Sequence, residues 1–137
     1  WQACEAQVSQ MSARQHDQIL AAVSHLPHVL AFAFMNHVRT SAGYDRNNQG
    51  QSGVHPGDLL HFAGGGFRDF TRIAGSSPEM WRDICLANRE ALSSQIDAYQ
   101  RQLSEVREML VRGDGEALER IFAQAREARR QWLKDLS

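Results

Sequence analysis

Cysteine, net charge and long apolar runs are all scarce in this sequence of 137 residues. Its two cysteines, Cys4 and Cys85, have no metal-ligand spacing and cannot specify a disulfide scaffold, which favours reduced thiols in the cytoplasm. A formal charge of -1 excludes a global attraction to nucleic acid or to an anionic membrane. No apolar run has the length of a membrane span and no charged leader precedes one, so we expect neither a membrane helix nor a signal peptide.

Helical spacing of apolar residues is the main pattern that is present, and the chain is long enough to bury the core of one domain. Ser12 and Gln15 have capping-box spacing, which predicts a helix start. Pro27 lies inside the helical pattern that follows, and we expect it to kink the helix near residues 23–24. Residues 41–56 contain most of the turn-forming residues and no periodicity, which predicts a mobile loop.

Further helix boundaries are marked by local signals. We expect a short helix over residues 58–62 and another from about Phe67, after three glycines. Ser77 followed by Pro78 predicts a helix start, with the proline at the first helical position. Asn88 is expected to interrupt that helix and to cap the next one.

Large apolar residues repeat by four and three over residues 89–112, and one face of residues 116–134 is also apolar. The first set is Leu92, Ile96, Tyr99, Leu103, Val106 and Leu110, and the second is Leu118, Ile121, Phe122, Ala125, Ala128 and Trp132. The two segments fit a helical hairpin within one chain or an interface between subunits, and we expect part of this seam to be shared across a dimer. The predicted fold class is all-α, a helical dimerisation domain with long antiparallel helices and a short irregular N-terminal stretch.

Two histidines three residues apart form the first candidate site. His25 and His28, in the string SHLPH, share a helix face, whereas His16 lies about two and a half turns away. The pattern fits polar helix residues, one of them hydrogen-bonded in the core, or imidazoles that bind an oxygen-rich ligand. A metal site ranks below both, because no cysteine or carboxylate has suitable ligand spacing.

A glycine-rich segment, GGGFRDFTRIA from Gly64 to Ala74, is the second candidate site. Three glycines before a helix let a ligand approach the backbone, and a helix start attracts anions. Arg68 and Arg72 are four residues apart, so both can project from one helix face and bind a carboxylate. The alternative is a plain loop whose arginines pair with Asp69 and other surface acids. The segment has neither the phosphate-loop nor the dinucleotide pattern.

These strings together resemble the prephenate and arogenate dehydrogenase family. His16-Asp17, SHLPH, GGGFRDFTRIA, PEMWRDI and Asn88 follow the family's order and spacing, and the resemblance covers residues 1–134. It implies that residues 1–11 end a Rossmann-type domain that binds NAD or NADP and is otherwise missing from this sequence. Residues 12–137 would be the helical substrate-binding and dimerisation domain. The family's reaction moves hydride from prephenate to the nicotinamide, releases carbon dioxide and leads to tyrosine.

The resemblance also implies roles for individual residues. Arg72 matches the arginine that binds a prephenate carboxylate. His28 matches a substrate-pocket histidine that is linked to the sensitivity of the enzyme to tyrosine. Gly65 falls in the glycine strip that lines the pocket, and Trp81 matches a tryptophan near the substrate. The predicted substrate-binding set is completed by Arg68, Asp69 and His25. Arg68 stands where some members carry lysine. No catalytic, cofactor-binding or metal-binding residue is predicted in this sequence.

Two functions from different classes are kept open. In the first, the chain is the homodimeric, substrate-binding part of a prephenate or arogenate dehydrogenase, with tyrosine a candidate inhibitor, and is inactive without its nucleotide-binding domain. In the second, it is a stand-alone helical module that binds tyrosine or a related aromatic acid as a regulator. A plain dimerisation domain would bind no ligand at Arg72.

Overall fold

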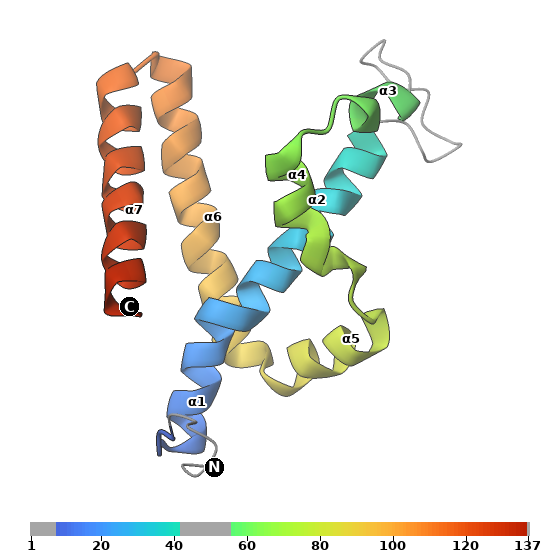
Figure 1. The fold of residues 1–137 in the computed structure, drawn as a ribbon, viewed down its shortest axis with the longest axis vertical. Coiled ribbons are helices and arrows are strands. Elements are labelled where there is room, and N and C mark those ends of the chain that lie inside the picture. The colour runs from blue at the N-terminus through green and yellow to red at the C-terminus, as the bar shows by residue number, and fades with distance from the viewer. Residues whose placement is uncertain (1–7, 42–55, 137) are drawn as a thin grey trace. The chain divides into compact units, whose positions relative to one another are not determined.

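The computed structural model describes residues 8–41 and 56–136, and every regular element in these two ranges is helical (Figure 1). The prediction of an all-α fold is therefore confirmed. The chain forms two compact units, one that ends at Gln95 and one that begins at Ile96. The predicted mobile loop at residues 41–56 falls, apart from its ends, outside the described residues.

The first helix, α1 (Ala13–Leu20), begins at the predicted capping box. The Ser12 hydroxyl accepts the Gln15 N–H at 3.3 Å, and the Gln15 side-chain oxygen accepts the Ser12 N–H at 3.0 Å. Each side chain satisfies a backbone donor that the helix leaves without a partner.

A π-helical turn, η2 (Ala21–His25), joins α1 to α2 (Leu26–Ser41). The Leu26 N–H donates to the Ala21 carbonyl, five residues back rather than four. The irregularity predicted near residues 23–24 is thus a wider helical turn. It lies just before Pro27, whose missing backbone N–H interrupts the ordinary hydrogen-bond pattern of the helix.

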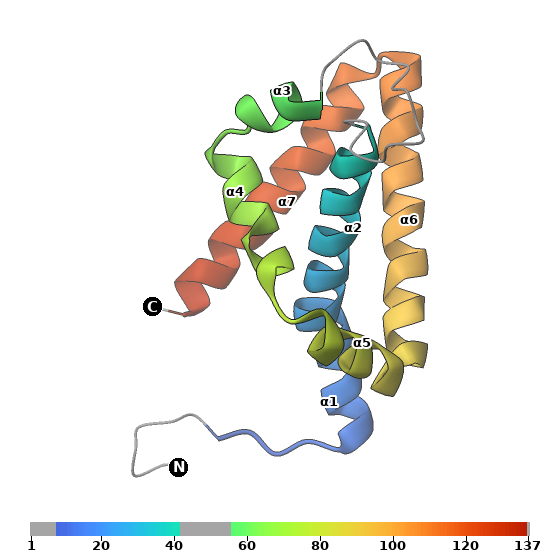
Figure 2. The ribbon, with the colours of Figure 1, turned by 90° about the vertical axis from the view of Figure 1, so that its right-hand side faces the viewer.

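Helices α3 (Pro56–His61) and α4 (Gly65–Thr71) follow, and a 3-10 turn, η3 (Arg72–Gly75), continues α4. Helix α4 lies along α2 (Figure 2), where the Phe34 ring contacts the rings of Phe67 and Phe70 at centroid distances of 5.7 and 5.6 Å. Helix α4 begins two residues before the predicted start at Phe67. Gly64 is the N-cap residue of this helix and has extended backbone.

Helix α5 (Pro78–Ala87) begins as predicted, with the Ser77 hydroxyl accepting the Met80 N–H at 3.2 Å. Asn88 ends it, and α6 (Arg89–Arg112) starts at the next residue. The Asn88 N–H donates to the Ile84 carbonyl, and its own carbonyl accepts from Leu92. This junction is confirmed, and it fixes the Asn88 backbone from both sides.

The second unit consists of the rest of α6, a turn, and α7 (Gly115–Asp135). Gly113 has a φ of 67°, and the Asp114 N–H donates to the Met109 carbonyl at 2.9 Å. Together with the Gly113-to-Leu110 hydrogen bond this is a Schellman cap. The Asp114 carboxylate then caps α7 by accepting the Ala117 N–H at 2.9 Å.

Gly113→Ala should lower the free energy of unfolding by about 1–2 kcal/mol, because a Cβ is strained at positive φ. Gly115→Ala is the matched control, since Gly115 lies two residues on, at the start of α7, and an added Cβ meets nothing within 4 Å at either position. Urea titration at one protein concentration measures both. Equal effects of the two substitutions would contradict the explanation from φ.

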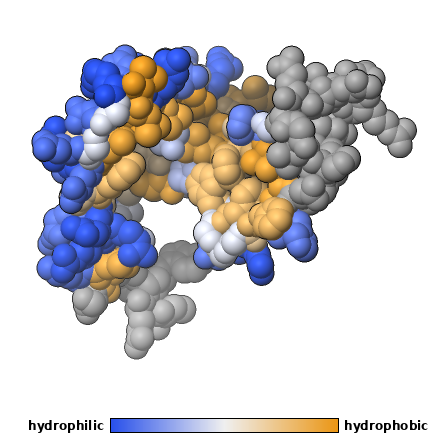
Figure 3. All heavy atoms as spheres, turned by 90° about the horizontal axis from the view of Figure 1, so that it is seen from above, coloured by the Kyte–Doolittle hydropathy of each residue, from blue (hydrophilic) through white to orange (hydrophobic). Residues whose placement is uncertain are grey.

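Much of the apolar seam on α6 and α7 stays exposed within this unit. Leu110 is 62% exposed and Phe122 is 60% exposed, and Leu103 and Trp132 are also exposed. Apolar side chains reach the surface beside hydrophilic ones in the space-filling view (Figure 3). The intramolecular hairpin therefore leaves apolar surface of the kind that subunit interfaces cover.

The continuous helix Ala13–Ser41 is long and apolar enough to cross a membrane by length and composition, with a window of mean hydropathy 1.5 that is 11% buried. The expectation concerned an uninterrupted apolar run, whereas this match averages over interspersed polar residues, so the absence of a membrane helix stays a prediction. The core helix of a soluble protein passes the same test. One face of this helix packs on protein, since His25 is buried and hydrogen-bonded to the α5–α6 junction.

Candidate functional site

Three of the predicted site residues meet around the Trp81 ring. Trp81, on α5, is 8% exposed, and its ring stacks on His28 with a centroid distance of 3.8 Å and an interplanar angle of 21°. His25, at the end of the π-helical turn, makes an edge contact with the same ring at 6.1 Å. The structure therefore brings the histidine pair and the tryptophan of a distant segment into one cluster.

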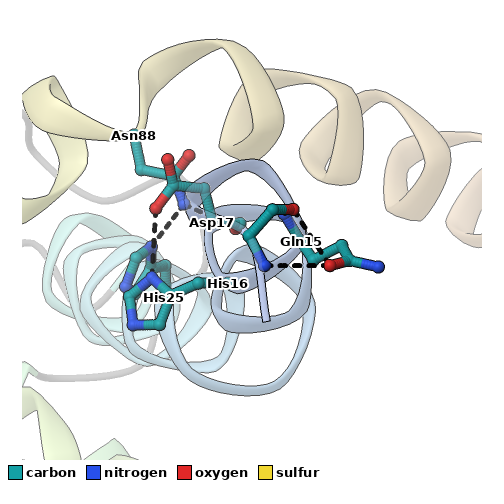
Figure 4. Close-up of polar contacts among 6 residues, drawn as sticks. Gln15, His16, Asp17, His25 and Asn88 are labelled. Atoms are coloured by element: carbon teal, nitrogen blue, oxygen red, sulfur yellow. Dashed lines mark hydrogen bonds and ion pairs between the residues drawn. The ribbon is translucent and has the colours of Figure 1, made fainter. Parts of the chain in front are cut away.

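Asn88 holds this cluster from the other side. Its side-chain nitrogen Nδ2 lies 2.7 Å from the Asp17 backbone carbonyl and 3.2 Å from His25 Nδ1 (Figure 4). The Asp17 carboxylate instead contacts His16 Nδ1 at 3.1 Å. Asn88 was predicted as a helix cap and as part of the family pattern but not as a contact of His25, because only the fold brings residue 88 near residues 17 and 25.

Burial lowers the pKa of His25 below its ordinary value of 6.5. The nearby His16 and His28 act in the same direction, whereas Asp17 opposes them. Because the imidazolium is disfavoured in these surroundings, His25 is a neutral ring around neutral pH.

His28 and Trp81 each have one ring nitrogen without a hydrogen-bond partner among the described residues. His28 Nδ1 lies 2.9 Å from the Ser24 carbonyl and donates to it, which leaves Nε2 as a lone-pair acceptor in the neutral ring. Trp81 Nε1 is buried and finds no acceptor among the described residues. A buried donor without a partner is costly, and a ligand oxygen at this point would satisfy it.

The two predicted arginines occupy different local settings. Arg68 lies inside α4, whereas Arg72 follows its last residue and begins η3. Both are exposed, and within the described residues neither has a hydrogen-bond or ion-pair partner. The alternative that they pair with Asp69, which is exposed, has no support in this part of the chain.

The expected position of Arg72 relative to a helix start is wrong. We expected the helix to begin near Phe67, which would put the positive end of its dipole about one turn before Arg72. Helix α4 instead begins at Gly65 and spans 7 residues, so Arg72 lies at its C-terminal end. Any attraction of an anion to Arg72 must come from the guanidinium itself.

Gly65 is the first residue of α4, and an added Cβ there would meet no atom within 4 Å. Arg68 lines a separate groove of about 670 Å³ together with Phe32, Met35, Leu60, His61 and Phe67, among others. Neither Arg72, His28 nor Trp81 lines this groove. The cluster around Trp81 and the Arg68 groove are thus two distinct places in the first unit. In the described ranges, no three histidine, cysteine or acidic side chains are grouped as metal ligands.

Comparison with known proteins connects these features to a family. A family model described as "Prephenate dehydrogenase, dimerization domain" matches residues 12–124. The cyclohexadienyl dehydrogenase of Zymomonas mobilis is 33% identical over 129 residues, which are 94% of this chain and 41% of that protein. The prephenate dehydrogenase of Bacillus subtilis is 35% identical over 120 residues, or 88% of this chain and 29% of that protein.

Solved structures of prephenate and arogenate dehydrogenases are also similar to this chain. Prephenate dehydrogenase from A. aeolicus, in complex with hydroxyphenyl propionate and NAD+, matches with a TM-score of 0.76 and 36% identity over 91% of this chain and 40% of its own. Arogenate dehydrogenase from Synechocystis matches with a TM-score of 0.82 over 96% of this chain and 44% of its own; at 21% identity it supports the fold alone. The chain spans less than half the length of each of these relatives.

Proposed function

The chain belongs to the prephenate dehydrogenase dimerization-domain family, and from this premise we propose that it is the dimerising and substrate-binding part of a dehydrogenase acting on prephenate or arogenate. The observation that carries the proposal is the cluster of His25, His28 and Trp81, which presents unpartnered ring nitrogens in a domain of this family. Arg72 and Arg68 are the cations available for carboxylates.

The chemistry of the substrate fits such a set of groups. Prephenate carries two carboxylates and a ring hydroxyl, so it offers oxygen atoms to an arginine and to ring N–H donors. Loss of carbon dioxide produces an aromatic ring and makes hydride transfer favourable. This part of the enzyme therefore needs mainly to orient the substrate.

The nicotinamide cofactor does not fit the residues of this chain. A dinucleotide fingerprint follows a strand and opens a long helix, whereas Gly64–Gly66 follow a short helix and lead into one of 7 residues. We therefore place NAD or NADP on another part of the enzyme. NAD+ is present in the A. aeolicus structure, and the choice between NAD and NADP belongs to that other part.

The isolated 137-residue chain should not reduce NAD+ or NADP+ with prephenate, because its sequence has no dinucleotide fingerprint. The full-length protein is the positive control, and the absorbance of the reduced nicotinamide is the measurement. Prephenate-dependent reduction by the isolated chain above a blank would contradict the assignment. A full-length protein that binds tyrosine but oxidises neither prephenate nor arogenate would favour the regulatory module.

The isolated chain should be a dimer in solution, because the exposed seam on α6 and α7 offers apolar surface that one chain does not cover. Light scattering at micromolar concentration should give twice the chain mass of 15.5 kDa. Leu103→Glu, in the exposed seam, should shift this mass toward the monomer. Ser104→Glu, at the exposed polar neighbour, is the matched control and should not. A wild-type chain with the monomer mass would argue against the dimer.

A further inference from the structure

Asn88, at 9% exposure, is a buried polar side chain that is not among the predicted site residues, and the other buried polar side chain in the described part of the chain is His25, at 8%. The Asn88 backbone is fixed between α5 and α6 by hydrogen bonds to Ile84 and Leu92. Its side chain reaches residues 71 and 63 positions earlier in the sequence, Asp17 and His25. A helix cap alone would not require this side chain to reach across to α1.

The Asp17 carbonyl settles which atom of the Asn88 amide faces the cluster. Asparagine oxygen and nitrogen are assigned from their partners, and the atom 2.7 Å from the Asp17 carbonyl must donate, since a carbonyl can only accept. The amide NH2 group therefore faces Asp17, and the same nitrogen lies 3.2 Å from His25 Nδ1. Its second hydrogen is directed to that ring nitrogen.

The position of the His25 proton follows from this donor. An amide nitrogen has no lone pair to offer, so His25 Nδ1 must be the acceptor and the ring proton must lie on Nε2. No carboxylate competes at Nδ1 in the described residues, because the Asp17 carboxylate contacts His16. Among the described residues, His25 Nε2 has no hydrogen-bond partner, and it is not among the fully buried atoms.

We propose that Asn88 is a positioning residue that holds His25 as the neutral tautomer protonated on Nε2, so that this ring offers the substrate a fixed hydrogen-bond donor. The ionisable groups that act on the ring are His16 and Asp17 from α1 and His28 from α2, while α5 contributes the uncharged indole of Trp81. The tautomer of His25 does not depend on the proposed function, whereas the role of its Nε2–H as a donor to substrate rests on that function. His28, whose Nδ1 donates to Ser24, supplies the opposite atom, an Nε2 acceptor, to the same cluster.

The tautomer can be read directly from long-range proton–nitrogen NMR spectra of the chain labelled with 15N-histidine. His25 is assigned by the signals that disappear in His25→Gln. At a pH where the ring is neutral, the wild type should show a protonated Nε2 and an unprotonated Nδ1. A ring protonated on Nδ1, or one that exchanges between the two tautomers, would overturn the proposal. This measurement decides the question even if an Asn88 variant does not fold.

Asn88→Asp replaces the donor by a carboxylate, which accepts a hydrogen bond from a protonated Nδ1. In this variant Nδ1 should become protonated, and the ring should titrate at higher pH than in the wild type. Gln18→Glu, at an exposed amide beside Asp17, is the matched control and should leave the tautomer unchanged. An unchanged His25 tautomer in Asn88→Asp, or the same change of tautomer in Gln18→Glu, would overturn the direct role of Asn88.

In the full-length enzyme, at a pH where the ring is neutral in both proteins, Asn88→Asp should lower kcat/KM for prephenate by about tenfold, the value of one hydrogen bond to a charged group, because the ring proton then lies on Nδ1 and Nε2 no longer donates. Gln18→Glu should leave it unchanged. An altered tautomer with unchanged kcat/KM would overturn the use of His25 as a donor to substrate. A wild-type enzyme with no activity on prephenate or arogenate would refute the proposed function, while the NMR result would still decide the role of Asn88.

Discussion

Arg72→Ala in the full-length enzyme should raise the Michaelis constant for prephenate by roughly 30-fold or more, because the bound substrate would bury the charge pair, and removal of one partner of a buried charge pair commonly costs roughly 2–5 kcal/mol. Arg72 is exposed and has no ion-pair partner among the described residues, so its guanidinium is available to a ligand. The constant for the nicotinamide cofactor should change little. Steady-state kinetics with each substrate varied in turn measures both constants.

Two further arginine variants and one histidine variant sharpen this test. Arg72→Lys should recover only part of the loss, since an ammonium group cannot make the two parallel hydrogen bonds of a guanidinium. Arg82→Ala is the matched control, because Arg82 is exposed and already contacts Asp83 at 2.8 Å. His28→Ala should do less damage than Arg72→Ala. An unchanged prephenate constant in Arg72→Ala would remove Arg72 as the anchor and favour Arg68 or a plain dimerisation domain.

Trp81→Ala should destabilise the fold by about 3–5 kcal/mol, the usual cost of truncating a large buried aromatic side chain. Few large side chains are buried in the described part of the chain, and Trp81 is the largest of them. Its removal also takes away the ring on which His28 stacks. Urea titration of the isolated chain at one protein concentration measures the loss.

Trp81→Phe should recover most of this stability, because Nε1 makes no hydrogen bond within the described residues that phenylalanine would lose. Leu86→Ala, on the same helix, is the control for an exposed apolar residue, since Leu86 is 60% exposed. Surface substitutions typically change the free energy of unfolding by about 0.5 kcal/mol or less. A decrease no larger than this in Trp81→Ala would show that the ring does not support the fold.

Helix boundaries that depend on neighbouring residues could be predicted from the order of residues alone. The Ser12–Gln15 capping box, the Ser77–Pro78 start and the end of α5 at Asn88 are all formed as expected. Each is a hydrogen bond or a backbone restriction between residues at most four positions apart, so it follows from the local order of residues. The periodic apolar seam likewise predicted the two long helices, although not how little of it one chain would bury.

The assembly of the site, in contrast, depends on contacts between helices that are distant in the sequence. The motif order pointed to His25, His28 and Trp81 as pocket residues, but their stacking depends on how α5 packs on α2. The Asn88 contact to His25 joins residues 63 positions apart, a distance over which spacing in the sequence carries no geometric information. The early start of α4 was missed because three glycines fit a loop and a helix N-terminus equally well, and only the contacts of α4 with α2 separate the two.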